Sequence, residues 1–290
     1  MEVFMKKIKN FAQEKTILFS LAVCCISFLF LKGSGLLFSL FPGNTLWAFI
    51  DELFGILWPV ALSILFGFCC IYNAKGFGSA LKAGMAFFVF DIFVLVIKYL
   101  NAVLNIHPQW QTLPVILLGI LSMIAIGVRE EVLFRGIIGN SLLFKYGTAQ
   151  KGLWFAIIVS SLFFGGVHIT NIFKGVELIG LIAQILGAFT AGLFFTAVYL
   201  RSGNIWALIL LHALEDSVGL FESTFTVTTV TKYDQVSNLN VGGTILMACV
   251  HICLALFLLR KSKQPAIFAR LEQLRNQAGW SEVSSCETGN

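Results

Sequence analysis

The feature that most constrains the fold is a series of apolar stretches, each long enough to cross a membrane. A helix needs roughly 20 apolar residues to span the hydrocarbon core of a bilayer. Because backbone groups in lipid must be satisfied internally, repeated stretches of this length predict an all-α polytopic helix bundle. About eight transmembrane helices are expected, with soft edges at 16–41, 48–73, 78–104, 113–145, 150–169, 175–200, 204–221 and 241–260. The stretch 204–221 is marginal in length, whereas 113–145 is long enough to tilt or protrude.

The composition supports this class. Hydrophobic residues make up 58% of the 290 residues and charged residues only 12%, whereas soluble domains carry about 25% charged residues. The sequence has no Walker loop, no glycine-rich dinucleotide turn and no basic-aromatic surface. We therefore expect a lipid bilayer as the surroundings and no nucleic-acid partner.

The placement of Lys and Arg predicts the orientation of the bundle, since cytoplasmic loops carry an excess of both residues. With the N-terminus inside, the outer loops hold only Lys174 and Lys232, and nearly all other loop cations fall on the inner side. This asymmetry requires an even number of spans and places both termini in the cytoplasm. Short loops without an organelle-retention signal favour a multi-pass protein of a bacterial plasma membrane.

Two parts of the chain differ in character. Residues 1–263 form the predicted transmembrane bundle, with the chemically informative motifs in 113–221. Segment 264–290 is predicted to begin with an amphipathic helix on the cytoplasmic membrane surface and to end in a disordered tail. The apolar face of that helix comprises Ile267, Leu271, Leu274 and Ala278.

The stretch "REEVLFRG" at 129–136 places four charged residues inside an apolar run. Each charge near the bilayer centre costs about 2.5–3.5 kcal/mol on insertion scales, so such residues are candidates for function. Glu131 and Arg135 are four residues apart and lie one above the other on a helix, in the favoured acid-before-base order. That pair neutralises itself. Glu130 has no base at the corresponding position and is left without a structural explanation.

Further intramembrane polar residues lie in two later helices. His168 follows a pair of glycines in "FFGGVH", and His212 and Asp216 are four apart on one face of "HALED". At 1.5 Å per residue, Glu130 and His168 lie about 22–26 Å along their helices from the cation at the inner end of each helix. His212 lies about 16 Å from the corresponding cation of its own helix. The first two can meet on antiparallel neighbours, and a tilted helix could bring His212 to them.

Such a constellation suits hydrolysis. A glutamate in a low-dielectric pocket has a raised proton affinity and can act as a base toward water. One imidazole can orient that water, and another with a hydrogen-bonding neighbour can stabilise the oxyanion of a cleaved amide. The constellation therefore predicts a polar cavity that opens to one side of the membrane.

The same residues fit three ordered motifs. "EEVLFR" fits Glu-Glu-x-x-x-Arg, "FGGVH" fits Phe-x-x-x-His and "HALED" fits His-x-x-x-Asn/Asp. In this order, the region 113–221 resembles the CPBP intramembrane proteases, a family that includes CAAX prenyl endopeptidases and bacterial abortive-infection or bacteriocin-immunity proteins. The resemblance implies an endopeptidase that cleaves a membrane-associated protein or peptide.

Carried over by position, the resemblance implies a role for each motif residue. Glu130 is the expected general base, and His168 is its expected partner on the water. His212 and Asp216 would stabilise the oxyanion. Glu131 and Arg135 would hold the helix geometry.

Other interpretations remain open at this level. A non-catalytic immunity or regulatory protein of the same fold would keep the helices without needing a base, and a proton-coupled transporter is a weaker alternative because the sequence shows no inverted repeat. Zinc is possible, with Glu130, His168 and His212 as its ligands. Because no His-Glu-x-x-His pair is present, the interpretation without a metal is favoured, and the need for a metal stays open. Arg129 stands where the family pattern suggests an uncharged residue. Asp91, in the middle of a span, is expected to pair with Lys98 or with another helix.

Overall fold

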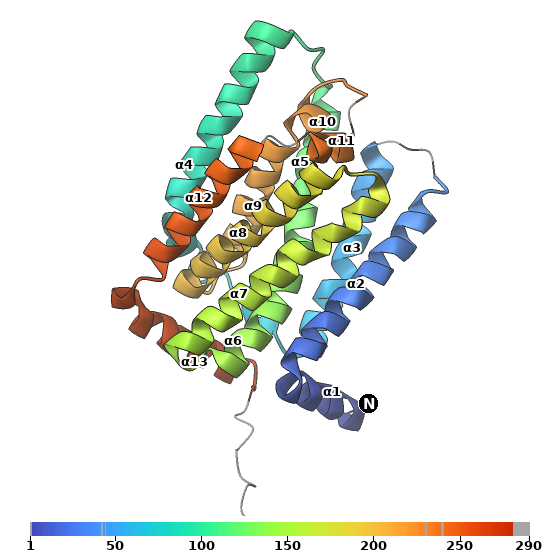
Figure 1. Ribbon diagram of the computed structural model, residues 1–290. Helices are drawn as coiled ribbons and strands as arrows, with labels where there is room; N and C mark the ends of the chain where they lie inside the picture. The colour runs from blue at the N-terminus through green and yellow to red at the C-terminus, as the bar shows by residue number, and fades with distance from the viewer. Residues whose placement is uncertain (1, 42, 44, 230, 239–240, 281–290) are drawn as a thin grey trace, which may run out of the picture.

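The computed structural model describes residues 2–280 except 42, 44, 230, 239 and 240, and within them it confirms the predicted all-α bundle (Figure 1). The extended segments in the described part meet in one isolated β-bridge, between Trp110 and Thr226. The helices are α1 (Glu2–Glu14), α2 (Thr16–Phe38), α3 (Thr45–Leu65), α4 (Phe77–Asn101), α5 (Leu113–Glu131), α6 (Asn140–Tyr146), α7 (Gln150–Gly166), α8 (Leu178–Ser202), α9 (Trp206–Gly219), α10 (Phe221–Phe225), α11 (Lys232–Ser237), α12 (Val241–Leu258) and α13 (Gln264–Gln277).

The number of long spans differs from the prediction. Within the described residues, 7 helical stretches are long and apolar enough to cross a membrane, and the expected eighth span at 204–221 is shorter than predicted. Helix α9 has 14 residues, or about 21 Å at 1.5 Å per residue. Gly203, with a φ of 69°, ends α8 in the left-handed conformation, and α9 ends at Gly219. Helix α9 packs against α4 and α5, so neighbouring helices rather than lipid cover much of it.

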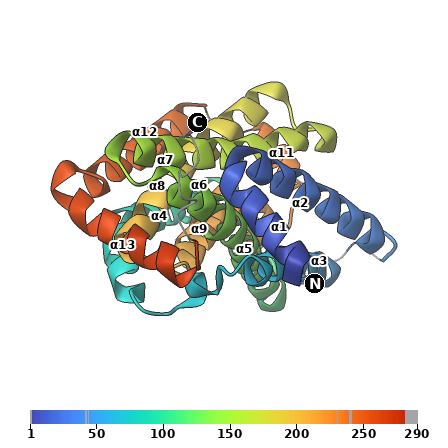
Figure 2. The ribbon, with the colours of Figure 1, turned by 90° about the horizontal axis from the view of Figure 1, so that it is seen from below.

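Both terminal helices lie at the same end of the bundle. Figure 2 shows α1 and α13 across this end, which we call the basal end, whereas α10 and α11 lie at the opposite, distal end in Figure 1. Lys9 Nζ donates to the Ala278 carbonyl oxygen at 3.1 Å and ties the two terminal helices together. An even number of passages therefore separates them, because the short α9 returns the chain to the distal end. That the basal end faces the cytoplasm remains a prediction.

Helix α13 uses its apolar face against the protein. Ile267, Leu271, Leu274 and Ala278 are all buried in the main hydrophobic core, and α13 packs against α6 and α8. This face therefore contacts the bundle, and the placement of the helix at the membrane surface stays a prediction. The predicted disordered tail, 281–290, lies outside the described residues.

The long fourth stretch changes its helical geometry in the middle. Leu113–Tyr146 forms 34 helical residues, and the segment Val132–Gly139 between α5 and α6 is a π-helix in which every residue is buried. A Cβ at Gly136 would lie 2.6 Å from Ile71 Cδ1, so the glycine lets this turn approach its neighbour closely. Single π-helical turns occur frequently at functional sites. This one begins directly after Glu130 and Glu131.

Candidate active site

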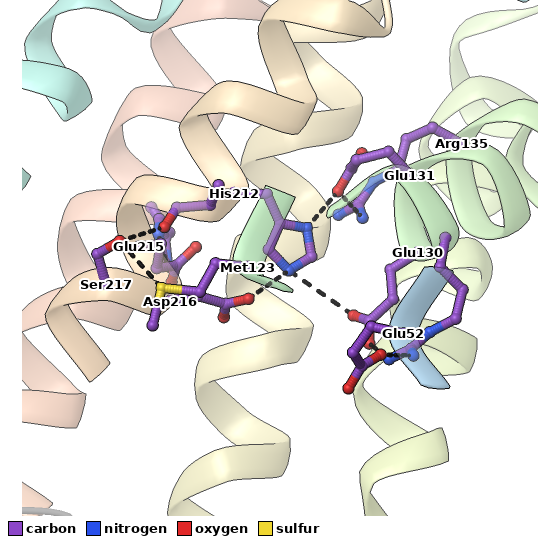
Figure 3. A network of polar contacts seen from close by, with 12 residues as sticks. Glu52, Met123, Glu130, Glu131, Arg135, His212, Glu215, Asp216 and Ser217 are labelled. Atoms are coloured by element: carbon purple, nitrogen blue, oxygen red, sulfur yellow. Dashed lines mark hydrogen bonds and ion pairs between the residues drawn. The ribbon is translucent and has the colours of Figure 1, made fainter. Parts of the chain in front are cut away.

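Residues from three segments meet at the end of α5. Glu130 and Glu131 end α5, His168 lies in the 3-10 segment Val167–Lys174 that follows α7, and His212 and Asp216 lie on α9. In Figure 3 the His212 imidazole lies at the centre, with carboxylates on both sides. The structure thus brings His212 to the two glutamates, although its distance from the inner flank suggested a shallower depth. It can do so because α9 is short and packs directly against α5.

One side of His212 is closed. Its Nδ1 lies 2.7 Å from Glu131 Oε1, and the same oxygen accepts from Arg135 Nη1 at 2.7 Å. The Glu131 side chain is 0% exposed and that of Arg135 is 2% exposed. The rings of Phe164 and Phe195 flank the guanidinium, at 4.3 and 5.2 Å from its carbon. Glu131 and Arg135 thus form a paired, water-excluded group that also fixes one nitrogen of His212.

The other side of His212 is partly open. Its Nε2 lies 3.7 Å from Glu130 Oε2 and 3.8 Å from Asp216 Oδ2. These side chains are 17% and 26% exposed, in contrast to Glu131. Both distances exceed a direct hydrogen bond, and separations of this kind accommodate a bridging polar atom. Three chemically reactive groups therefore face one small space on this open side.

His168 borders this open side without bonding to it. The ring is half-buried and lies within electrostatic range of Glu130 and His212. Phe164 connects the two imidazoles, because its ring centroid lies 5.9 Å from that of His168 and 5.8 Å from that of His212. The His168 side chain forms no hydrogen bond within the part of the chain that the structure describes.

Arg129, for which the sequence offered no role, has two carboxylate partners. It forms an ion pair with Glu52 of α3, and its Nη2 lies 3.4 Å from Glu130 Oε1. Lys232 of α11 approaches the other side of Glu52, with Nζ 3.8 Å from Oε1. Sequence spacing could not pair Arg129 with Glu52, because the two residues are 77 positions apart.

A second polar cluster lies behind α9. His251 of α12 is fully buried, with Nδ1 3.3 Å from Thr190 Oγ1 and Nε2 3.5 Å from Glu215 Oε1. Asp91 of α4 is also fully buried and lies within electrostatic range of Glu215. Within the described residues, neither carboxylate oxygen of Asp91 accepts a hydrogen bond, so the expected pairing with Lys98 is not formed. Glu215 of α9 connects this cluster to the site, and so do two neighbouring rings of α8, because Phe194 stacks on His251 and Phe195 stacks on His212.

The proposed zinc ligands do not form a compact set. In the described ranges, no three His, Cys, Asp or Glu side chains are grouped closely enough to hold a metal ion. His212 already directs Nδ1 to Glu131, which leaves only Nε2 for any further partner. In the described part of the chain, Glu130, His168 and His212 therefore do not converge as a ligand set.

Together, the fold and the site define a multi-pass membrane protein with a hydrolase-like group of carboxylates and imidazoles inside the bundle. Residues 111–218 match the family described as type II CAAX prenyl endopeptidase Rce1-like. This match covers all three sequence motifs and supports the resemblance of this segment to the CPBP family of CAAX-type proteases. No curated protein and no solved structure was found to match the chain.

Proposed function

We propose that this protein is an intramembrane endopeptidase that uses Glu130 to activate water and cleaves a peptide bond of a membrane-associated protein or peptide. The observation that carries the proposal is the convergence of Glu130 and Asp216 on His212 Nε2, at 3.7 and 3.8 Å, on the one partly open side of a buried site. The family match over the motif segment supports the reaction class.

In the proposed reaction, Glu130 takes a proton from a water molecule as the water oxygen attacks the carbonyl carbon of the substrate. His168, which borders the same space, orients this water. The carbonyl oxygen becomes an oxyanion as the tetrahedral carbon forms. Glu130 then delivers the proton to the amide nitrogen as the C–N bond breaks, which gives a carboxylic acid and an amine.

His212 and Asp216 stabilise the oxyanion in this proposal. Because Nδ1 lies 2.7 Å from Glu131 Oε1, Nε2 is the nitrogen that faces the substrate. In its protonated form, Nε2 donates to the oxyanion. Asp216 faces the same nitrogen and donates to the oxyanion only when it is itself protonated. Donors that are held in place before the reaction contribute more than donors that must reorganise.

The test is proteolysis by the purified full-length protein in liposomes. Two probes define the substrate class: a farnesylated peptide that ends in Cys-aliphatic-aliphatic-X, and a membrane-anchored peptide without the prenyl group. Mass spectrometry should detect new peptide ends with the wild-type protein and none with Glu130→Gln. We expect the non-prenylated probe to be preferred if the source is a bacterial plasma membrane.

The alternative, a non-catalytic immunity or regulatory protein, makes the opposite forecast. A binding surface needs no base, so Glu130→Gln would leave the biological effect of such a protein intact. Comparison of membranes that contain the wild-type protein or Glu130→Gln, for peptides released from membrane-bound precursors, separates the two functions.

A further inference from the structure

Arg129 is built into the interface between α3 and α5. Its guanidinium pairs with Glu52 and rests against Gly55, where a Cβ would lie 3.3 Å from Arg129 Cδ and Nη1. Glu52 and Gly55 are three residues apart and so share one face of α3. Glu52 supplies the opposite charge and Gly55 leaves room for the guanidinium. Helix α3 thus provides a specific binding position for the Arg129 side chain.

This placement gives the two oxygens of Glu130 different surroundings. Oε1 faces Arg129 Nη2 at 3.4 Å, and Oε2 faces His212 Nε2 at 3.7 Å. A carboxylate with one oxygen held by a cation cannot rotate freely about its terminal bond. The guanidinium therefore selects which oxygen points toward the open side of the site.

We infer that Arg129 is a positioning residue for Glu130, and that Glu52 of α3 holds Arg129 in place for this purpose. The inference rests on the proposed function, in which Glu130 is the base. Glu52 lies outside the segment 111–218 that matches the protease family, so the catalytic arrangement in this chain depends on a helix that the family motifs do not include.

The ionic chain continues to the distal end. Lys232 Nζ lies 3.8 Å from Glu52 Oε1, and the lysine side chain is 48% exposed. Helix α11 begins with a capping box, in which the Thr231 backbone and hydroxyl donate to Asp234 and hold the pKa of this exposed carboxyl below its usual range. Exposed ion pairs contribute little. We therefore expect a substitution of Lys232 to lower kcat much less than a substitution of Glu52.

The test measures kcat and KM separately with whichever liposome probe the wild-type protein cleaves. Arg129→Gln should lower kcat by about 10- to 100-fold and change KM by less than about threefold, because a misplaced base costs turnover rather than binding. Arg129→Lys should recover part of kcat, since lysine keeps the charge but loses the fork that reaches two carboxylates. Arg260→Gln, which removes a cation exposed at the basal end, is the matched control and should leave kcat unchanged.

A double variant separates positioning from helix packing. Glu52→Gln/Arg129→Met removes both charges, so it should keep the thermal stability of the wild-type protein in detergent but remain about 10- to 100-fold slow. Recovery of wild-type kcat in this double variant, or an unchanged kcat in Arg129→Gln, would overturn the inference.

A second measurement works without proteolysis. A hydrophobic carbodiimide reacts with carboxyl groups that are not held in ion pairs, and mass spectrometry locates the label. Labelling of Glu130 should increase several-fold in Arg129→Gln and in the double variant, and not in Arg260→Gln. If no probe is cleaved, or if Glu130→Gln still cleaves, the proposed function fails. Separately, equal labelling of Glu130 in all these proteins would show that Arg129 does not hold Glu130.

Discussion

Glu130 and Glu131 are neighbours in the chain but lie in opposite environments. Glu131 is fully buried and has Arg135 and His212 within 2.7 Å, whereas Glu130 is 17% exposed and its nearest cations are 3.4 Å away or more. Successive residues of a helix point about 100° apart. The same turn therefore directs the Glu131 carboxylate to the packed interior and the Glu130 carboxylate to the open side. The difference shows how two adjacent residues of one motif can place one carboxylate in a packed ion pair and leave the other accessible.

His212 connects the two environments. Nδ1 belongs to the closed side and Nε2 to the open side, so the orientation of the ring is set by Glu131 while its free nitrogen faces Glu130. The Phe195 ring is stacked on the imidazole, with centroids 5.6 Å apart. The closed side thus holds the His212 ring in the orientation that directs Nε2 to the open side.

The largest expected effect is on the open side. Glu130→Gln keeps the size and polarity of the side chain but removes the base, so cleavage should fall by about 10²–10⁴-fold while the folded yield stays at the wild-type level. His168→Ala should also lose activity, and the two losses should not add, because both residues act on one water. Cleavage by purified Glu130→Gln at the wild-type rate would remove this residue from the mechanism.

On the closed side, Arg135→Ala should mainly affect folding. The change leaves Glu131 buried without its cation, which costs roughly 3–5 kcal/mol by analogy with other buried pairs, and folded yield after detergent extraction should drop accordingly. The double variant Glu131→Gln/Arg135→Met has no unpaired buried charge and should recover part of the yield. A double variant that folds no better than Arg135→Ala would contradict the structural role of this pair.

Asp216 tests whether the open side extends beyond Glu130. Its side chain is 26% exposed and approaches only His212 Nε2 among the charged groups that the structure pairs with it. Asp216→Ala should therefore preserve folding and substrate binding but slow cleavage by about 10²–10³-fold, the loss expected for an oxyanion donor. An equal loss of folded yield would instead place Asp216 with the closed side.

The sequence was sufficient for the features that local spacing determines. Glu131 and Arg135 are paired because residues four apart lie on the same face of a helix, and the structure has this contact at 2.7 Å. The helical class followed from the apolar stretches. The predicted roles of Glu130, His168, His212 and Asp216 remain proposals, since proximity alone does not test catalysis.

Features that depend on the packing of distant helices could not be predicted. Arg129 and Glu52 meet only because α3 lies against α5, and the cluster of His251 and Glu215 needs α9 and α12 in register. Hydropathy gives the length of an apolar run but not its helical ends, so it could not show that α9 has only 14 residues. Periodicity likewise assumes 3.6 residues per turn and could not predict the π-helix at Val132–Gly139.

Phe164 offers the smallest and sharpest test of the boundary between the two sides. Its ring lies 4.3 Å from the guanidinium carbon of Arg135, yet it also lies beside both imidazoles. If its contribution belongs to the closed side, Phe164→Leu should lower the free energy of unfolding in detergent by about 1–2 kcal/mol, the scale of a desolvated cation–π contact, and should change kcat by less than about threefold. Phe93→Leu, at a position 60% exposed on α4, controls for the loss of ring area and should change neither quantity.

A large fall in kcat at unchanged stability would show instead that the Phe164 ring holds His168 and His212 in place for the reaction. The open side would then include this ring, which lies between it and Arg135.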